Sequence, residues 1–179
     1  DAFTGVSIIK MIEELDAGPI LNQEKVMLDH TETFGSLHQV LSEIGAKNLL
    51  RVLDNIPSNK EILQSSRLVS YAPKIKKADT KLDFNQQASV LEARVRGLAP
   101  VPGAWFEYQG ERFKVFKAEV VDGRGNAGLI INEDLTIACG EKALNILEIQ
   151  RQGKDVMRAS DLIRGFKFKK GDIVNHSTR

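Results

Sequence analysis

The chain has 179 residues, of which 42% are hydrophobic and 27% charged, and its formal net charge is +1. This balance is typical of a globular protein with one ordinary domain or two small ones, and it excludes a disordered chain or one embedded in a membrane. No run approaches the roughly 20 apolar residues that a membrane span needs. The single cysteine, Cys139, excludes an internal disulfide. We expect it to be a buried thiol in a protein of the reducing cytoplasm.

The chain begins with elements of an α/β domain. Residues 6–11 and 19–28 have the apolar spacing of strands, and an acidic turn separates them. Thr31 or Thr33 can cap a helix that follows with apolar residues at helical spacing, and Pro57 cannot continue that helix. A helix of this length must bury an apolar stripe. Because two strands are a small platform for it, we expect these elements to belong to a larger sheet.

The rest of the chain changes character twice. Residues 58–81 are polar and then basic, which is the profile of a linker. A helix beginning at Asp83 or Asn85 comes next, and short strands are predicted at 104–108, 112–121, 129–131, 135–138 and 144–149, before a short helix at about 160–165 and a basic tail strand. Their number and size favour a five-stranded barrel of the OB type, a fold that often binds oligonucleotides.

The predicted organisation therefore has three parts and an uneven charge. Residues 1–57 are the end of an α/β domain, residues 58–81 a basic linker, and residues 82–179 an OB-like domain. The first 66 residues carry five Lys and Arg against ten Asp and Glu, whereas the remainder carries 20 against 14. Basic clusters lie at 67–81 and 151–170. Each cluster alone is typical of a solvated face, but two in one half of the chain favour a surface that meets a polyanion.

Few other residues form a pattern that indicates chemistry. Asp16-Ala17-Gly18-Pro19 reads either as an ordinary turn or as a turn that presents a carboxylate for proton transfer. The alternating aromatic residues of the strand at 104–108 are more typical of a barrel's core and surface than of a base-stacking platform: Trp105, Phe106 and Tyr108. The histidines share no metal-ligand spacing, so we predict no metal: His30, His38 and His176.

Five motifs follow one another along nearly the whole chain. They are Thr4-Gly5-Val6 leading to Leu15-Asp16-Ala17-Gly18, then Ser70-Tyr71-Ala72-Pro73-Lys74-Ile75, Leu82-Asp83-Phe84, Arg96-Gly97-Leu98-Ala99-Pro100-Val101-Pro102-Gly103-Ala104, and Ile149-Gln150-Arg151-Gln152-Gly153-Lys154-Asp155-Val156-Met157. In this order they resemble the folate-dependent formyltransferases, above all the branch that acts on methionyl-tRNA. Phe84 and Val101 stand where that family often has Trp. The family's upstream Asn-x-His motif has no match.

The resemblance implies specific roles. Asp16 would be catalytic, and the loop of Glu13, Glu14, Leu15 and Asp16 would receive the pteridine ring of 10-formyltetrahydrofolate. The residues that would face tRNA are Lys74, Lys76 and Lys77 in the linker and Arg151, Lys154 and Arg158 in the C-terminal domain. Because the chain lacks the upstream Asn and His, we expect it to be part of a longer protein and to be inactive alone.

The resemblance also implies a reaction. A formyl group would pass from 10-formyltetrahydrofolate to the amino group of initiator Met-tRNA, in a monomeric protein. A sugar-amine formyltransferase resembles the same family and is one alternative. A stand-alone RNA-binding module, or an inactive remnant of a split gene, is the other. The lysine-rich linker and the Gln150-x-x-Gly153-Lys154-x-x-Met157 element favour the enzyme that acts on tRNA.

Overall fold

A computed structural model of the chain describes residues 1–56, 60–65, 67 and 69–175. The chain divides into two compact units, Asp1–Lys74 and Ile75–Arg179, and each is described by itself. None of the helices in the described ranges has both the length and the apolar character that crossing a bilayer requires.

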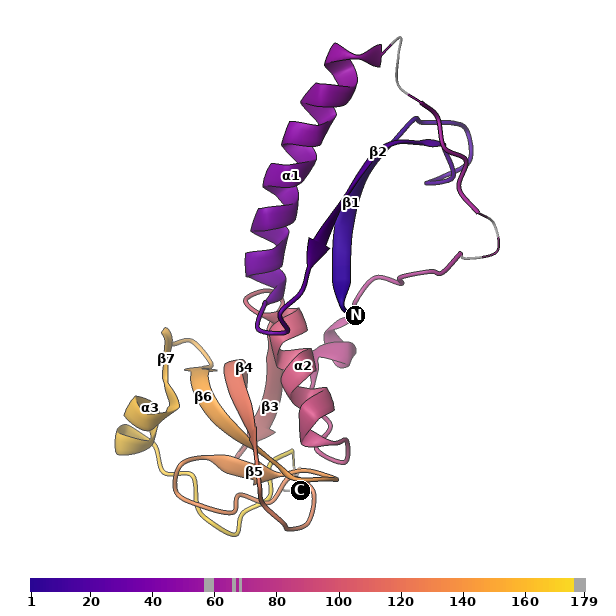
Figure 1. Cartoon of the computed structure of the whole chain (residues 1–179). Helices are drawn as coiled ribbons and strands as arrows, with labels where there is room; N and C mark the ends of the chain where they lie inside the picture. Colours follow the sequence, from indigo (N-terminus) through magenta and orange to yellow (C-terminus); the bar gives the residue numbers. More distant parts are fainter. Residues whose placement is uncertain (57–59, 66, 68, 176–179) are drawn as a thin grey trace. The chain divides into compact units, whose positions relative to one another are not determined.

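The first unit is built on an antiparallel hairpin of β1 (Phe3–Ile9) and β2 (Ile20–Met27). The strands approach closely at Gly5, where a Cβ atom would lie 2.3 Å from the carbonyl oxygen of Glu24. Only glycine fits there, which explains this residue of the first motif. Helix α1 (Phe34–Asp54) runs alongside the hairpin (Figure 1) and packs on both strands. Both strands and the helix were predicted.

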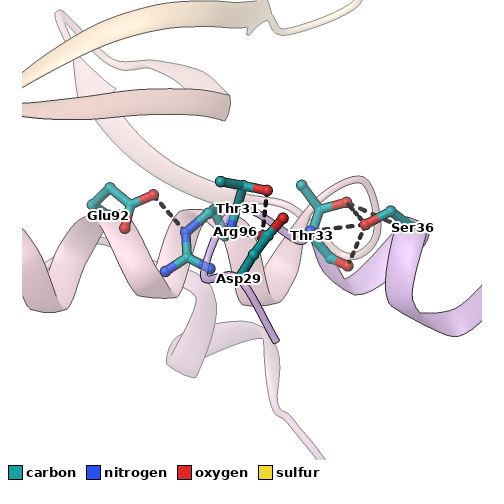
Figure 2. A network of polar contacts seen from close by, with 6 residues as sticks. All are labelled: Asp29, Thr31, Thr33, Ser36, Glu92 and Arg96. Carbon is teal, nitrogen blue, oxygen red and sulfur yellow. Dashed lines mark hydrogen bonds and ion pairs between the residues drawn. The ribbon is translucent and has the colours of Figure 1, made fainter. Parts of the chain in front are cut away.

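Helix α1 begins at a capping box. The Ser36 amide donates to Thr33 Oγ1 at 3.2 Å, and the Thr33 amide donates to Ser36 Oγ at 3.0 Å (Figure 2). Thr33 is therefore the cap of the two threonines considered, because its side chain satisfies an amide of the first turn. Thr31 instead donates its hydroxyl to Asp29 at 2.6 Å, and this bond lowers the pKa of the Asp29 carboxyl. Pro57 lies outside the described residues.

The hairpin covers only part of the apolar surface of α1. Asn48 and Val52 are the buried residues of the helix, and Gly45 approaches Val6, whose Cγ1 would lie 3.5 Å from an added Cβ. Several large apolar side chains of the helix are more than two-fifths exposed: Phe34, Val40, Leu49, Leu50 and Leu53. The membership of these elements in a larger sheet stays a prediction.

The second unit is an antiparallel sheet with helices packed on it (Figure 1). Its strands pair in the order β3-β4-β6-β5, and β7 pairs with β6. The elements are η3 (Lys77–Thr80, a short 3-10 helix), α2 (Ala88–Leu98), β3 (Ala104–Tyr108), β4 (Glu111–Val121), β5 (Thr136–Ala138), β6 (Ala143–Arg151), β7 (Val156–Arg158) and α3 (Ala159–Gly165). On α2, Glu92 and Arg96 form an i,i+4 ion pair at 2.6 Å (Figure 2).

The core of the second unit lies between α2 and the sheet. Its largest fully buried side chains include Phe106, Phe113, Leu82, Leu91 and Leu144. The predicted hairpin at Gln109-Gly110 is confirmed: both residues have positive φ, 51° and 78°, as a two-residue hairpin turn requires. The predicted mixture of an α/β segment and a mainly β domain is confirmed.

Four details of the second unit differ from expectation. Helix α2 begins at Ala88 and not at Asp83 or Asn85, because the Asp83 carboxylate accepts from the Asn85 amide in a turn that precedes the helix. Residues 129–131 form isolated bridges, Leu129 with Ile173 and Ile130 with Ile137, and not a strand. The bridge of Ile173 is also the one β pairing found in the described part of the basic tail, where a strand was predicted. β7 was not predicted. No pairing in the described ranges joins β3 to β5, so closure into an OB-like barrel stays a prediction.

Candidate functional site

Asp16 lies in the turn that joins β1 to β2. Its φ of 57° is in the left-handed region, where Asp is tolerated better than most residues. The residue is exposed, and within the described ranges its carboxylate has no hydrogen-bond or ion-pair partner. The side chain is therefore open to a bound reactant.

The backbone of this turn is anchored from a distant segment. The Gln64 side-chain amide donates to the carbonyl oxygens of Asp16 at 2.8 Å and of Gly18 at 2.6 Å. Ile62 exchanges both backbone hydrogen bonds with Ile20, at 2.8 and 3.0 Å, so residues around 62 lie antiparallel to the start of β2. These groups hold both carbonyls that flank Ala17. Sequence reasoning missed Gln64, because it falls in a polar segment that was expected to be a solvated linker.

The base of the turn is closed by Lys10. Its amide donates to the Pro19 carbonyl at 3.0 Å, and its ammonium pairs with Glu61 at 2.7 Å. Gly18 is buried here, and a Cβ at that position would lie 1.7 Å from the Lys10 carbonyl oxygen. The glycine of the Leu15-Asp16-Ala17-Gly18 motif is therefore required by close packing of two backbone segments.

The residues predicted to receive the pteridine ring are next to Asp16 and exposed. Glu13, Glu14 and Leu15 face solvent, and Leu15 is 88% exposed. Within the described part of the chain, their backbone amides donate no hydrogen bond to another group. Free amides beside an exposed apolar side chain can pair with the edge of a flat heterocycle and cover its face.

The linker lysines predicted to face tRNA are all exposed. Lys74 ends the first unit. Lys76 and Lys77 begin the second unit, and Lys76 is held by its amide, which donates to Asp79 Oδ2 at 2.7 Å. Lys76 and Lys77 line the same cavity.

The three basic residues predicted near the C-terminal end have different surroundings. Arg151 makes a two-bond pair with Glu111, at 2.6 and 2.8 Å, and its guanidinium lies 4.7 Å from the centre of the Phe166 ring. This pairing lowers the pKa of the Glu111 carboxyl and raises that of Arg151. Lys154 is exposed in the turn between β6 and β7, and Arg158 lines a separate cavity. Among the described residues, Arg151 is the one of the three whose side chain forms an ion pair.

No cluster of three or more potential metal ligands was found among the described side chains. His176, one of the three histidines considered above, lies outside them.

Two family models match the chain. The one for the C-terminal domain of formyl transferases matches residues 74–167, and the one for the formyl transferase domain itself matches residues 1–53. The chain belongs to the formyl transferase family, and the resemblance stated from its motifs is confirmed.

Curated relatives show which formyl transferases the chain is similar to. The chain is 40% identical, over 96% of its length, to the methionyl-tRNA formyltransferase of Rhizorhabdus wittichii. It is 41% identical, over 97% of its length, to the enzyme of that name in Parvibaculum lavamentivorans. The chain spans 56% and 59% of these two relatives.

Solved structures share the fold. HypX from Aquifex aeolicus, crystallised with tetrahydrofolic acid, superposes on 98% of the chain with a TM-score of 0.67 at 18% identity, and the match covers 34% of HypX. The methionyl-tRNA formyltransferase of Clostridium thermocellum matches 69% of the chain at 18% identity, with a TM-score of 0.56 and 53% of its own chain covered. The sugar formyltransferase WlaRD matches 87% at 17% identity, with a TM-score of 0.57 and 57% of its own chain covered.

Proposed function

We propose that this chain takes part in transfer of a formyl group from 10-formyltetrahydrofolate to the amino group of initiator Met-tRNA. The observation that carries the proposal is the 40% identity to methionyl-tRNA formyltransferase over nearly the whole chain. In this proposal residues 1–57 end the catalytic domain, residues 58–81 form the linker, and residues 82–179 contact tRNA. The protein acts as a cytoplasmic monomer without a metal.

The reaction assigns a clear task to Asp16. An amine that attacks a formyl carbon must lose a proton, while the formyl oxygen gathers negative charge in a tetrahedral intermediate. A fixed carboxylate favours the positive charge on the attacking side, directly or through a neighbouring imidazole or water. The anchored backbone and the free carboxylate of Asp16 suit this role.

In this proposal the formyl donor binds beside Asp16. The free amides of Glu13, Glu14 and Leu15 can pair with the pteridine edge, and the exposed Leu15 side chain can pack on its face. The tRNA contacts are Lys74, Lys76, Lys77, Lys154 and Arg158, together with Arg151 if it exchanges Glu111 for a phosphate. Such contacts position RNA without reading its sequence.

The experiment uses a chimera. The portion of the Rhizorhabdus wittichii relative that this chain does not cover is joined upstream of Asp1, and formylation of charged initiator tRNA is measured. We expect formylated product from the chimera and none from the 179-residue chain, which contains no Asn-x-His motif. Asp16→Asn should lower kcat on the order of a hundredfold, the usual loss for a preorganised electrostatic partner.

The control is Glu43→Gln, which neutralises an exposed carboxylate on α1 in the same unit and should retain full turnover. Near-normal turnover of the Asp16→Asn chimera would remove the catalytic role of Asp16. A chimera that formylates a nucleotide-linked amino sugar and not Met-tRNA would establish the sugar-amine reading.

A further inference from the structure

The second unit contains a cavity whose charged lining is entirely cationic. It measures about 310 Å³, and the charged and aromatic residues that line it are Lys76, Lys77, Arg112, Lys114 and Trp105. No Asp or Glu lines it. The larger cavity of the same unit, about 470 Å³, has a balanced lining, since it contains Lys117 and Arg158 together with Asp134 and Glu148. The excess of positive charge is thus specific to the smaller cavity.

The pairing register of β3 and β4 places the strand residues that line this cavity on one face of the sheet. Trp105 on β3 is the direct partner of Lys114 on β4, and Arg112 lies two residues earlier on the same strand. Paired residues, and residues two apart in a strand, lie on one face of a sheet. The 3-10 helix η3 is tied to this face, because Trp105 Nε1 donates to Thr80 Oγ1 at 3.0 Å. This bond fixes the end of η3 opposite to Lys77.

Arg112 is held in place and forms no ion pair in the described residues: Glu107, its cross-strand partner on β3, pairs instead with Lys81 at 3.9 Å. Its guanidinium lies 4.1 Å from the centre of the Trp105 ring, a distance at which a cation is attracted to the ring face. Its Nε atom is buried and has no hydrogen-bond partner within the described residues. None of the four cations that line the cavity has an ion-pair partner in that part of the chain. A buried donor without a partner in a native protein calls for a ligand or water.

We propose that this cavity binds a backbone phosphate of RNA. The proposal rests on the proposed function for its choice of RNA. Arg and Lys together offer a forked donor and a point charge, the combination that recognises phosphate oxygens. Trp105 contributes by holding the Arg112 guanidinium against its ring, which positions that cation for an anion. The cavity volume lies at the small end of the range for ligand pockets and is large enough to admit a phosphate group.

The test measures binding of labelled initiator tRNA transcript to the 179-residue chain, by anisotropy between 0.05 and 0.3 M salt. Trp105 is the single tryptophan, so its emission reports on the cavity alone. The test variant is Arg112→Gln with Lys114→Gln. We expect about tenfold weaker binding and a log–log salt slope reduced by about one, the value for one lost phosphate contact.

Two variants serve as controls. Lys117→Gln with Arg124→Gln removes one Lys and one Arg charge from exposed positions of the same unit, and should leave affinity within about twofold and the slope unchanged. Arg112→Lys with Lys114→Arg keeps both charges and should retain the slope, which separates charge loss from a folding defect. In the unmodified chain, tRNA should change the emission of Trp105.

Equal losses in the test and control pairs would overturn the proposal, because they would reflect overall charge. So would tRNA binding that leaves Trp105 emission unchanged. A response of Trp105 to inorganic phosphate but not to tRNA would mark a small-anion site and also overturn it. Formyl transfer plays no part in these measurements, so failure of the chimera would remove the proposed function and leave the result for the cavity standing.

Discussion

The two hydrogen bonds from Gln64 to the turn around Asp16 provide a sharp test of how that turn is held. Gln64→Ala removes both bonds, at 2.8 and 2.6 Å, and leaves the ladder between β1 and β2 intact. A hydrogen bond contributes about 0.5–1.5 kcal/mol net. Gln64 is exposed, so the low end applies, and the two bonds together are worth about 1 kcal/mol.

A loss of about 1 kcal/mol should raise the population of the open turn about fivefold. The amide of Lys10, which donates to Pro19 at the base of the turn, should exchange with solvent about fivefold faster. Amides of α1 should be unaffected. Gln64→Glu should have a larger effect, because a carboxylate would then face two carbonyl oxygens.

Hydrogen exchange followed by NMR or mass spectrometry measures these rates. Gln39→Ala is the matched control, since the Gln39 side chain makes a single long bond of 3.4 Å, to Glu43 on α1. In the chimera, Gln64→Ala should lower kcat and leave the Michaelis constant for tRNA unchanged. Unaltered exchange at Lys10 in both Gln64 variants would refute the anchoring role.

Three further predictions concern the linker and the core. Replacing Lys74, Lys76 and Lys77 by Ala in the chimera should raise the Michaelis constant for tRNA more than that for the folate, because phosphate contacts are lost; equal increases for both substrates would contradict this. Burial raises the pKa of the Cys139 thiol from 9.0 to about 11, so its stabilising contribution is complete below pH 9 and is lost as the pH rises through 11. Unfolding measured against pH should show a larger loss of stability over this range in the natural chain than in Cys139→Ala, and the native thiol should react with a disulfide reagent only on unfolding. Tyr108→Phe should lower the free energy of unfolding by about 1–3 kcal/mol, because the buried hydroxyl donates to Asp172 at 2.7 Å; an unchanged melting temperature would contradict this.

Local features of the fold could be predicted from the sequence because short-range physics determines them. A threonine cap for α1 was predicted at Thr31 or Thr33, and the structure selects Thr33, whose capping box with Ser36 is complete within four residues. The positive φ values of Gln109 and Gly110 follow from the two-residue turn between strands. The strands on either side of the Asp16 turn could be predicted because each has apolar residues at strand spacing within its own segment. The family motifs likewise identified residues 13–16 as the candidate site.

The partners of those residues depended on tertiary structure. Gln64 reaches Asp16 across 48 positions of sequence, and Glu111 pairs with Arg151 across 40, so the predicted tRNA contact of Arg151 competes with an ion pair that no local pattern reveals. The stacking of Arg112 on Trp105 depends on the register of β3 against β4. Sequence alone therefore determined where turns, caps and charges lie. Pairing and packing between distant segments decided which charges are already neutralised and which remain available to a ligand.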